Sequence, residues 1–443
     1  MSAPRRLELL HWNDLHGRFE ALARLSHRAR EIRERADHPV LLLDAGDVEE
    51  TSVRLSAMSF GVAGWRLLGA AGVDAAVAGN GGLLRYGPDR LPEYAAALGS
   101  APLVCDLERD GATPAGADPS RIVEVGDLRV GIVGITDYYP QYDDFGLVER
   151  GRVTAVRREA AALRTAGADV VVVLSHAGLN HDRGLSWSLR GVADVIVGGH
   201  THDLLVTGDR DQGIPIAQAG WQGEHLGHIL IEVDDDGVRV VEMVLEPVAA
   251  DAPADPAVTD ELVAAEHDLD AWLSEVVAEL PEAAPLGDRD NPAARLLVEA
   301  LLDRQPGDLG LLIPVHLEAG LPAGPVTRRQ VWEATSSPGN VASATLTGAQ
   351  VRDMITRGRT DNYAAYSSRV SRGRPFGRLQ VVGLDGDLDD ARTYRVTGSD
   401  LEFSIFGGLV DARPDSYRTQ VPEILPEILE SHLRKHYPPR APS

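Results

Sequence analysis

The chain of 443 residues lacks several features that mark secreted and membrane proteins. It has a single cysteine, Cys105, and therefore no internal disulfide framework. It has no run of about 20 apolar residues, which a membrane-spanning helix requires. Residues 1–6 lead straight into an apolar segment, which leaves no room for a signal peptide. We therefore expect a cytoplasmic protein.

Positive charge is also scarce. The chain has 43 Lys and Arg against 67 Asp and Glu, a formal net charge of −24. Phosphate backbones and anionic lipid surfaces repel such a protein, so we expect neither nucleic acid nor a membrane as a partner. A small phosphorylated molecule, for example a nucleotide, remains compatible with this charge, because bound divalent ions would dominate the local field.

Five short apolar runs in the first half of the chain end in side chains that can hold a metal ion. Such runs, bounded by glycine and turn residues, predict buried parallel strands, whose carboxyl ends meet at one edge of a sheet. Nitrogen and oxygen ligands together suit Mn²⁺, Zn²⁺, Fe or Co²⁺, and the sequence does not choose among them. We predict that two divalent ions bind at this edge, with Asp14, His16, Asp47, Asn80, His176, His200 and His202 as the candidate ligands.

The pattern along the chain predicts two domains, as expected for this length. Strands alternate with helical stretches over residues 5–247, with helices expected at 22–35, 58–71 and 155–166 and hairpins at 122–133 and 228–246. A segment rich in Ala, Pro and Asp follows at 247–256, and helical periodicity runs over 257–280. We expect a first domain over 1–250, a linker and connector helix over 251–285, and a second domain over 286–443. A cut near Asp255 should then give two soluble pieces.

The apolar runs and their polar ends resemble the motifs of a known family. Residues 10–19, 44–47, 79–80, 174–178 and 198–202 are similar to the five motifs of the calcineurin-type metallophosphoesterases, and more narrowly to those of the 5′-nucleotidase branch. Residues 321–327, 345–348 and 393–400 resemble the C-terminal substrate domain of that branch. The resemblance implies an α/β fold, a four-layer αββα sandwich followed by a smaller α/β (α+β) domain. It also implies that Asp14, His16 and His202 hold one ion, that Asn80, His176 and His200 hold the other, and that Asp47 bridges them.

The chain departs from this family at the position that assists the leaving group. The family motif continues Asn-His-Glu-x-Asp, in which the His is held by the Asp and stabilises or protonates the departing oxygen. Here Gly81 stands in the place of the His and Leu84 in the place of the Asp, so no catalytic side chain can be assigned. We also expect the two consecutive glycines, Gly81 and Gly82, to have a backbone conformation that a side chain cannot adopt.

The second domain departs as well. Glu318 stands where the family has a phosphate-binding Arg, residues 337–340 lack the family's aromatic, and residues 407–410 lack the aromatic of its closing motif. The residues that sandwich a nucleobase therefore cannot be transferred to this chain, and ordinary nucleotide monoesters become doubtful substrates.

Three hypotheses follow. The first is a metal-dependent phosphohydrolase that acts on a small phosphate ester or anhydride with a good leaving group. The second is a pseudo-enzyme, a metal-stabilised scaffold that binds a ligand or a protein. The third is a phosphodiesterase.

Several other residues near the motifs are open to more than one interpretation. Arg18 and Arg85 lie close to the metal motifs and could stabilise charge on a leaving group, although surface salt bridges are the favoured interpretation. His316 could face the site. His181 and Asp182 are expected on a loop with a structural role. Trp332 and Phe376 are expected in the core, and Trp221 and His225 either line the cleft or only pack.

Overall fold

The computed structural model describes residues 4–211, 213–366, 373–383, 386–409, 414 and 416–439. The chain divides into two compact units, Met1–Leu269 and Asp270–Ser443, and the division falls within helix α8 (Pro256–Leu273). Among the described residues, no helix is both long and apolar enough to cross a membrane.

Unit 1 contains two five-stranded sheets. The first has the order β12-β11-β1-β2-β3, in which β1, β2 and β3 are parallel and β11 runs antiparallel to both β1 and β12. The second has the order β10-β9-β8-β6-β5, in which only β5 runs antiparallel to its neighbour. The strands are β1 (Arg5–Trp12), β2 (Val40–Asp44), β3 (Ala75–Ala76), β11 (His225–Asp234) and β12 (Gly237–Pro247), and then β5 (Ser120–Val125), β6 (Leu128–Thr136), β8 (Val170–His176), β9 (Val195–Gly198) and β10 (Ile216–Ala217).

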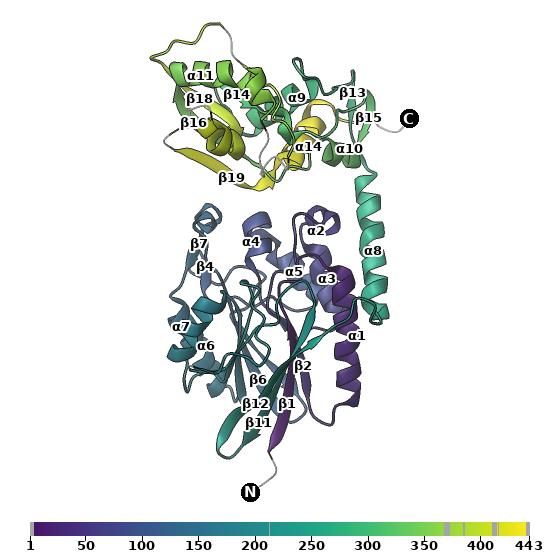
Figure 1. The fold of residues 1–443 in the computed structure, drawn as a ribbon, viewed down its shortest axis with the longest axis vertical. Coiled ribbons are helices and arrows are strands. Elements are labelled where there is room, and N and C mark those ends of the chain that lie inside the picture. The colour runs from purple at the N-terminus through teal and green to yellow at the C-terminus, as the bar shows by residue number, and fades with distance from the viewer. Residues whose placement is uncertain are drawn as a thin grey trace. The chain divides into compact units, whose positions relative to one another are not determined.

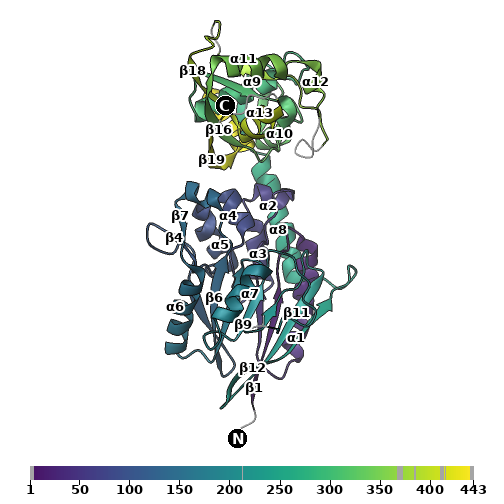
Figure 2. The ribbon, with the colours of Figure 1, turned by 60° about the vertical axis from the view of Figure 1, so that its left-hand side comes forward.

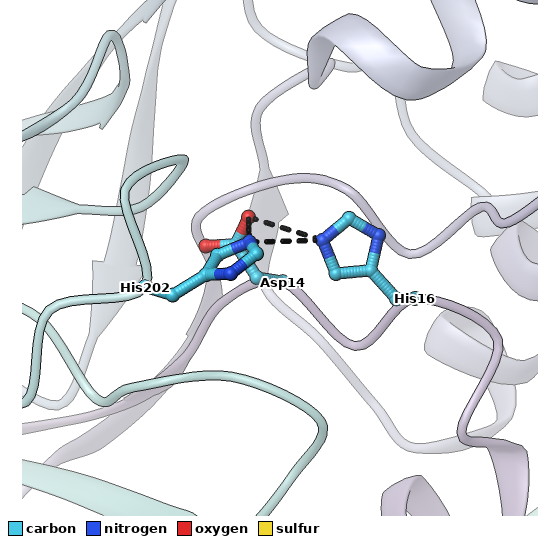
Figure 3. A group of neighbouring side chains, drawn as sticks. All are labelled: Asp14, His16 and His202. Carbon is cyan, nitrogen blue, oxygen red and sulfur yellow. Dashed lines mark hydrogen bonds and ion pairs between the residues drawn. The ribbon is translucent and has the colours of Figure 1, made fainter. Parts of the chain in front are cut away.

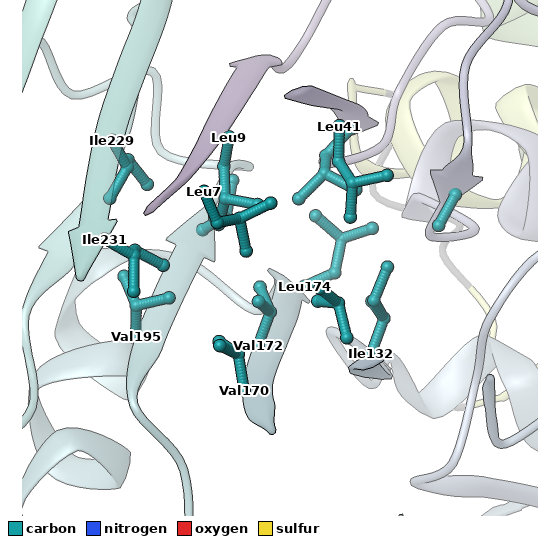
Figure 4. Close-up of a cluster of buried hydrophobic side chains, with 14 of the residues drawn as sticks. Leu7, Leu9, Leu41, Ile132, Val170, Val172, Leu174, Val195, Ile229 and Ile231 are labelled. Atoms are coloured by element: carbon teal, nitrogen blue, oxygen red, sulfur yellow. The ribbon is translucent and has the colours of Figure 1, made fainter. Parts of the chain in front are cut away.

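The core of unit 1 lies between these two sheets. Leu7 and Leu9 of β1 face Val170 and Val172 of β8, and all four side chains are fully buried (Figure 4). Val171 and Val173 of β8 point the other way, into a second core with α6 (Arg152–Thr165) and α7 (Leu179–Ser188). Strands buried on both faces are apolar at every position rather than at alternate ones, and β8 shows this pattern.

Helices cover the outer faces. Figures 1 and 2 show α1 and α6 on opposite sides of the pair of sheets. The helix α1 buries Leu22, Leu25 and Ala29, whose spacing gives one apolar face. The fold is therefore a four-layer αββα sandwich, which confirms the fold class expected for this domain. Its remaining elements are α1 (Phe19–Arg35), α2 (Arg54–Met58), α3 (Val62–Ala70), α4 (Asn80–Tyr86), α5 (Leu91–Leu98), α6 (Arg152–Thr165), α7 (Leu179–Ser188), β4 (Leu107–Arg109) and β7 (Leu147–Glu149).

Unit 2 is a smaller mixed α/β domain, as the resemblance implies. Its five-stranded sheet has the order β17-β14-β18-β16-β19, and only the β14–β18 pair is parallel. Trp332 and Phe376 are buried, as expected. The elements are β13 (Val276–Leu280), β14 (Leu309–Leu312), β15 (Gly324–Thr327), β16 (Asn340–Thr347), β17 (Gln380–Val382), β18 (Thr393–Ser399), β19 (Tyr417–Ile424), α9 (Pro292–Arg304), α10 (Arg328–Ala334), α11 (Gly348–Gly358), α12 (Asp361–Ala364), α13 (Gly407–Leu409) and α14 (Leu425–His436).

Two helix predictions were wrong in extent. The stretch 58–71 is not one helix, because Phe60 (φ +54°) and Gly61 (φ +83°) are left-handed and separate α2 from α3. The stretch 257–280 is helical only to Leu273. The β-branched residues Val276 and Val277 then begin β13, which pairs with β15.

Candidate metal centre

The candidate ligands lie at the carboxyl ends of the strands of unit 1. Asp14 and His16 follow β1, and Asp47 follows β2. Asn80 is the first residue of α4, His176 is the last residue of β8, and His200 and His202 follow β9. The strand order places these ends next to one another, so residues up to 188 positions apart in the sequence meet.

One group consists of Asp14, His16 and His202 (Figure 3). The Nε2 atoms of the two histidines are 3.1 Å apart. Asp14 Oδ1 lies 3.6 Å from Nε2 of His16 and 3.3 Å from Nε2 of His202. All three side chains therefore direct ligand atoms to a single point.

A second group surrounds His176, which is fully buried. Its Nε2 lies 3.3 Å from Asp47 Oδ2, 3.2 Å from Asn80 Oδ1 and 4.0 Å from Asp14 Oδ1. Its Nδ1 lies 2.7 Å from the carbonyl oxygen of Ala45, which fixes the ring and leaves Nε2 for a ligand. Asp14 Oδ1 is thus shared between the two groups.

His200 lies beside the second group and contacts one of its carboxylates through its backbone. Its ring centroid is 5.2 Å from that of His176. Its Nε2 is 3.5 Å from both Asp137 Oδ2 and the Tyr139 hydroxyl, and its backbone N–H donates to Asp14 Oδ2 at 2.8 Å. The structure therefore brings six predicted side chains into one connected set and places the seventh at its border.

The backbone at these residues is unusual. Eight non-glycine residues of the described chain have positive φ, and five of them are predicted ligands. Residues other than glycine adopt a positive φ uncommonly, and those that do cluster at functional sites. These five candidate ligands are Asp14 (φ +52°), His16 (+46°), Asp47 (+56°), His200 (+77°) and His202 (+60°).

The electrostatic surroundings of the centre also fit a cation. Asp14 Oδ1 is buried and has no hydrogen-bond partner among the described residues. Burial opposes the charged form of His176, but Asp47 and Asp14 outweigh burial and raise the pKa of His176 to about 10. A buried orphan carboxylate oxygen that faces three imidazole nitrogens is the arrangement that a divalent cation would satisfy. The residues present therefore fit the metal ions that the family implies.

The position of the missing His is occupied by the beginning of α4. The Gly81 N–H donates to Asp47 Oδ1 at 2.8 Å, and a Cβ at Gly81 would lie 3.1 Å from the same oxygen. Neither Gly81 nor Gly82 is left-handed, so the expected special backbone conformation was wrong. Side-chain crowding is the actual constraint, because a Cβ at Gly82 would lie 2.5 Å from Glu49 Oε1.

Glu49 was not found by sequence reasoning. It is buried next to α4 and accepts a hydrogen bond from Trp65 Nε1 at 2.6 Å, while its Oε2 has no hydrogen-bond partner within the described ranges. Burial and the nearby charge of Asp47 raise the pKa of Glu49 to about 8. Its partners Trp65 and Gly82 are distant in the sequence, so no local signal marks it.

Other residues near the site were missed or left open. Asn13 holds Asp14 through a 2.7 Å hydrogen bond from its Nδ2. Asp137 and Tyr139 follow β6, a further strand end with a ligand-type residue that the same pattern could have revealed. Trp221 stacks on His202 with ring centroids 4.8 Å apart, which places it at the site.

Asp182, Arg85 and Arg18 were also singled out in the sequence, and the structure shows where each one lies. Asp182 lies on α7 rather than on a loop, and it accepts a 2.5 Å hydrogen bond from Ser175 next to His176. Arg85 lies over the Tyr86 ring, and Arg18 is exposed at the start of α1.

In unit 2, His316 is buried between Ser337 and Ser399, at 2.8 and 3.0 Å. Glu318 accepts a hydrogen bond from Ser336. In residues 407–410, which differ from the family's closing motif, Val410 lies outside the described residues.

Comparisons with known proteins agree with this architecture. The model of the calcineurin-like phosphoesterases matches residues 7–204, and the model of the 5′-nucleotidase C-terminal domain matches residues 276–411. The metallophosphoesterase YunD of Bacillus subtilis is 25% identical over 90% of this chain and 89% of its own length. Bovine 5′-nucleotidase is 29% identical, but the chain spans only about half of that protein (57% of this chain, 51% of the relative).

Solved structures share the fold at low identity. A 5′-nucleotidase precursor of Thermus thermophilus superposes with a TM-score of 0.54 at 18% identity, covering 97% of this chain and 96% of that one. The NAD nucleotidase of Haemophilus influenzae superposes with a TM-score of 0.58 at 15% identity, covering 98% and 97%. With both family models matching in order, the chain belongs to the calcineurin-like metallophosphoesterases that carry a 5′-nucleotidase C-terminal domain, a family of hydrolases.

Proposed function

We propose that this protein is a divalent-metal-dependent phosphohydrolase that acts on a small phosphate ester or anhydride. The observation that carries the proposal is the convergence of candidate ligands on Asp14 Oδ1, a buried oxygen that has no hydrogen-bond partner in the part of the chain that the structure describes. The left-handed backbone at five of the ligands supports it, because such strain is retained where a site requires it.

In this proposal the ligands divide into two sets. Asp14, His16 and His202 hold one ion, Asn80, His176 and His200 hold the other, and Asp47 lies between them. Two bound ions supply Lewis acidity at a phosphoryl group and lower the pKa of water. The ion could be Mn²⁺, Zn²⁺, Fe or Co²⁺, since the donor set suits each of them.

Backbone and side-chain groups of the chain itself orient this centre. The carbonyl of Ala45 fixes the His176 ring, and Asn13 fixes the Asp14 carboxylate. Trp221 is 41% exposed and covers one face of His202, so it can limit the access of water on that side.

The substrate class follows from what is missing at α4. No imidazole stands at position 81 to donate a proton to a departing oxygen, and a general acid typically contributes about 10²–10⁴ in rate. We therefore propose substrates whose leaving group carries negative charge by itself, such as nucleoside diphosphates and activated esters. Nucleotide-like compounds are favoured because relatives are named for nucleotides.

The test is a substrate panel with purified protein, stripped of metal and reloaded with Mn²⁺ or Zn²⁺. We expect p-nitrophenyl phosphate and ADP to be hydrolysed, and Asp47→Asn to abolish turnover. Asp235→Asn, the same change on an exposed turn, should leave it intact. Binding without turnover would show a scaffold instead, and preference for a diester would show a phosphodiesterase.

A further inference from the structure

Another cluster of side chains that can ligate a metal ion lies in unit 2. Asp303 is near the end of α9, and His432 and His436 are one turn apart on α14, where residues four apart share a face. His432 Nδ1 is 2.9 Å and His436 Nε2 is 2.5 Å from the same atom, Asp303 Oδ2. One ligand atom from each residue lies within 4.8 Å of the others.

The geometry joins two helices at one point. The His432 and His436 rings lie side by side, with centroids 4.5 Å apart and planes inclined by 39°. His432 is buried, while His436 is open to solvent with a side-chain exposure of 41%. One ligand is therefore held by packing, and another can adjust as an ion enters.

The chemistry of the three side chains suits a cation. Asp303 supplies a carboxylate oxygen, and His432 and His436 each supply an imidazole nitrogen. A carboxylate and a neutral imidazole are the forms that ligate metal ions.

We propose that Asp303, His432 and His436 form a binding site for a divalent cation of the Zn²⁺ type. Two imidazole nitrogens and one carboxylate oxygen make a three-ligand set that leaves a fourth position for water. Ca²⁺ and Mg²⁺ do not fit, because they take oxygen ligands. An ion at this site clamps α14 to the end of α9 and so stabilises unit 2.

Lys435 is the natural competitor of this ion. Its Nζ lies 3.2 Å from Asp303 Oδ2, and its side chain is 63% exposed, so it can leave the carboxylate. Removing its charge should tighten metal binding. Lys435 is also the only lysine in the chain, which makes its reactivity easy to follow.

Equilibrium dialysis of the full-length protein against Zn²⁺ tests the site. We expect His436→Ala and Asp303→Asn each to bind one ion fewer per chain than wild type. His267→Ala, which removes an exposed histidine of α8, should bind as many as wild type. The measured quantity is a difference between variants, so it stands whether or not the centre in unit 1 binds metal.

Two further measurements decide the matter if a variant folds poorly. Lys435→Gln should bind the ion at least about tenfold more tightly than wild type, because it removes a like charge from the site. The rate of Lys435 acetylation in wild type can be measured by mass spectrometry of the peptide that contains it. Zn²⁺ should raise this rate severalfold, because the lysine leaves Asp303 when the ion binds. Equal Zn²⁺ stoichiometry in wild type and His436→Ala, or Lys435 acetylation unchanged by Zn²⁺, would overturn the proposal.

Discussion

Asp47 is the residue whose substitution should affect the whole centre of unit 1. Its Oδ2 contacts His176 and its Oδ1 accepts the Gly81 N–H, so it lies between β8 and the start of α4. We expect Asp47→Asn to weaken the binding of two ions, whereas His202→Ala should weaken mainly one. Metal analysis after dialysis at graded chelator concentrations measures this. Equal and mild losses in both variants would contradict the bridging role.

Asp182 offers a test of the electrostatics behind the centre. Burial raises the pKa of this carboxyl to about 7, and the hydrogen bond from Ser175 offsets burial only in part. The folded protein therefore keeps a proton that the unfolded chain releases near pH 4. This contribution to stability is complete below about pH 4 and is lost as the pH rises through about 7.

Asp182→Asn has no proton to lose, so its stability relative to wild type should rise between pH 4 and pH 8. A shift of about three pKa units corresponds to at most about 4 kcal/mol. Urea unfolding of both proteins across this pH range measures the difference. Asp235→Asn on the exposed turn should show a difference that does not change with pH, and a flat profile for Asp182→Asn would refute the buried-acid assignment.

Whether a residue of the centre could be predicted depends on whether local sequence or tertiary contacts position it. Asp14, His176 and His202 could be predicted because each ends an apolar run, and parallel strands align such ends. Glu49 could not, because its burial depends on contacts with Trp65 and Gly82 that only the fold creates. Left-handed backbone at histidine leaves no trace in the sequence, because histidine is not a residue that requires it.

At the scale of elements, α4 decides whether the missing dyad can be restored. Positions 81 and 84 are three apart on this helix and share a face, so an introduced His and Asp would meet. We expect Gly81→His with Leu84→Asp to accelerate AMP hydrolysis more than p-nitrophenyl phosphate hydrolysis. The rate of p-nitrophenyl phosphate hydrolysis divided by the rate of AMP hydrolysis should fall by about tenfold or more.

The controls for this pair separate mechanism from crowding. Gly81→Ala places a Cβ 3.1 Å from Asp47 Oδ1 without adding a proton donor, so it reports the steric cost alone. Gly81→His alone lacks the residue that would orient the ring. If wild type already hydrolyses AMP as readily as the activated ester, the idea that leaving-group assistance is missing is wrong.

Elements themselves were predicted best where periodicity was long and bounded. The helix α6 and the hairpins β5–β6 and β11–β12 are where the sequence places them. The junction of α8 and β13 was misplaced because helical spacing of apolar residues continued through Val276 and Val277. Pairing with β15 overrides that spacing, and such a tertiary contact cannot be read from one segment.

At the scale of the whole molecule, the segment around Asp255 is more firmly held than its composition suggests. Asp255 is fully buried, accepts hydrogen bonds from Ser26 at 2.7 Å and from the Ala257 N–H at 2.9 Å, and pairs with Arg30 at 2.6 Å. It therefore ties the start of α8 to α1. Arg66 also pairs with Glu261 and Asp268, farther along α8. We propose that the chain is better divided after Leu269 than near Asp255.

This division can be tested with two N-terminal pieces, residues 1–269 and 1–255. The longer piece keeps the part of α8 that carries Val258 and Ala265, which are buried, and the ion pairs of Arg66. Burying one such apolar side chain fully is worth about 1.5–3 kcal/mol. The free energy of unfolding of the longer piece, measured by urea denaturation, should therefore exceed that of the shorter piece by at least about 2 kcal/mol. Disrupting the anchor with Asp255→Ala in the longer piece should remove much of that gain, whereas Asp251→Ala, an exposed acid of the same segment, should not. Equal stability of the two pieces would mean that α8 does not stabilise unit 1. The domain boundary would then be placed before α8, near Asp255.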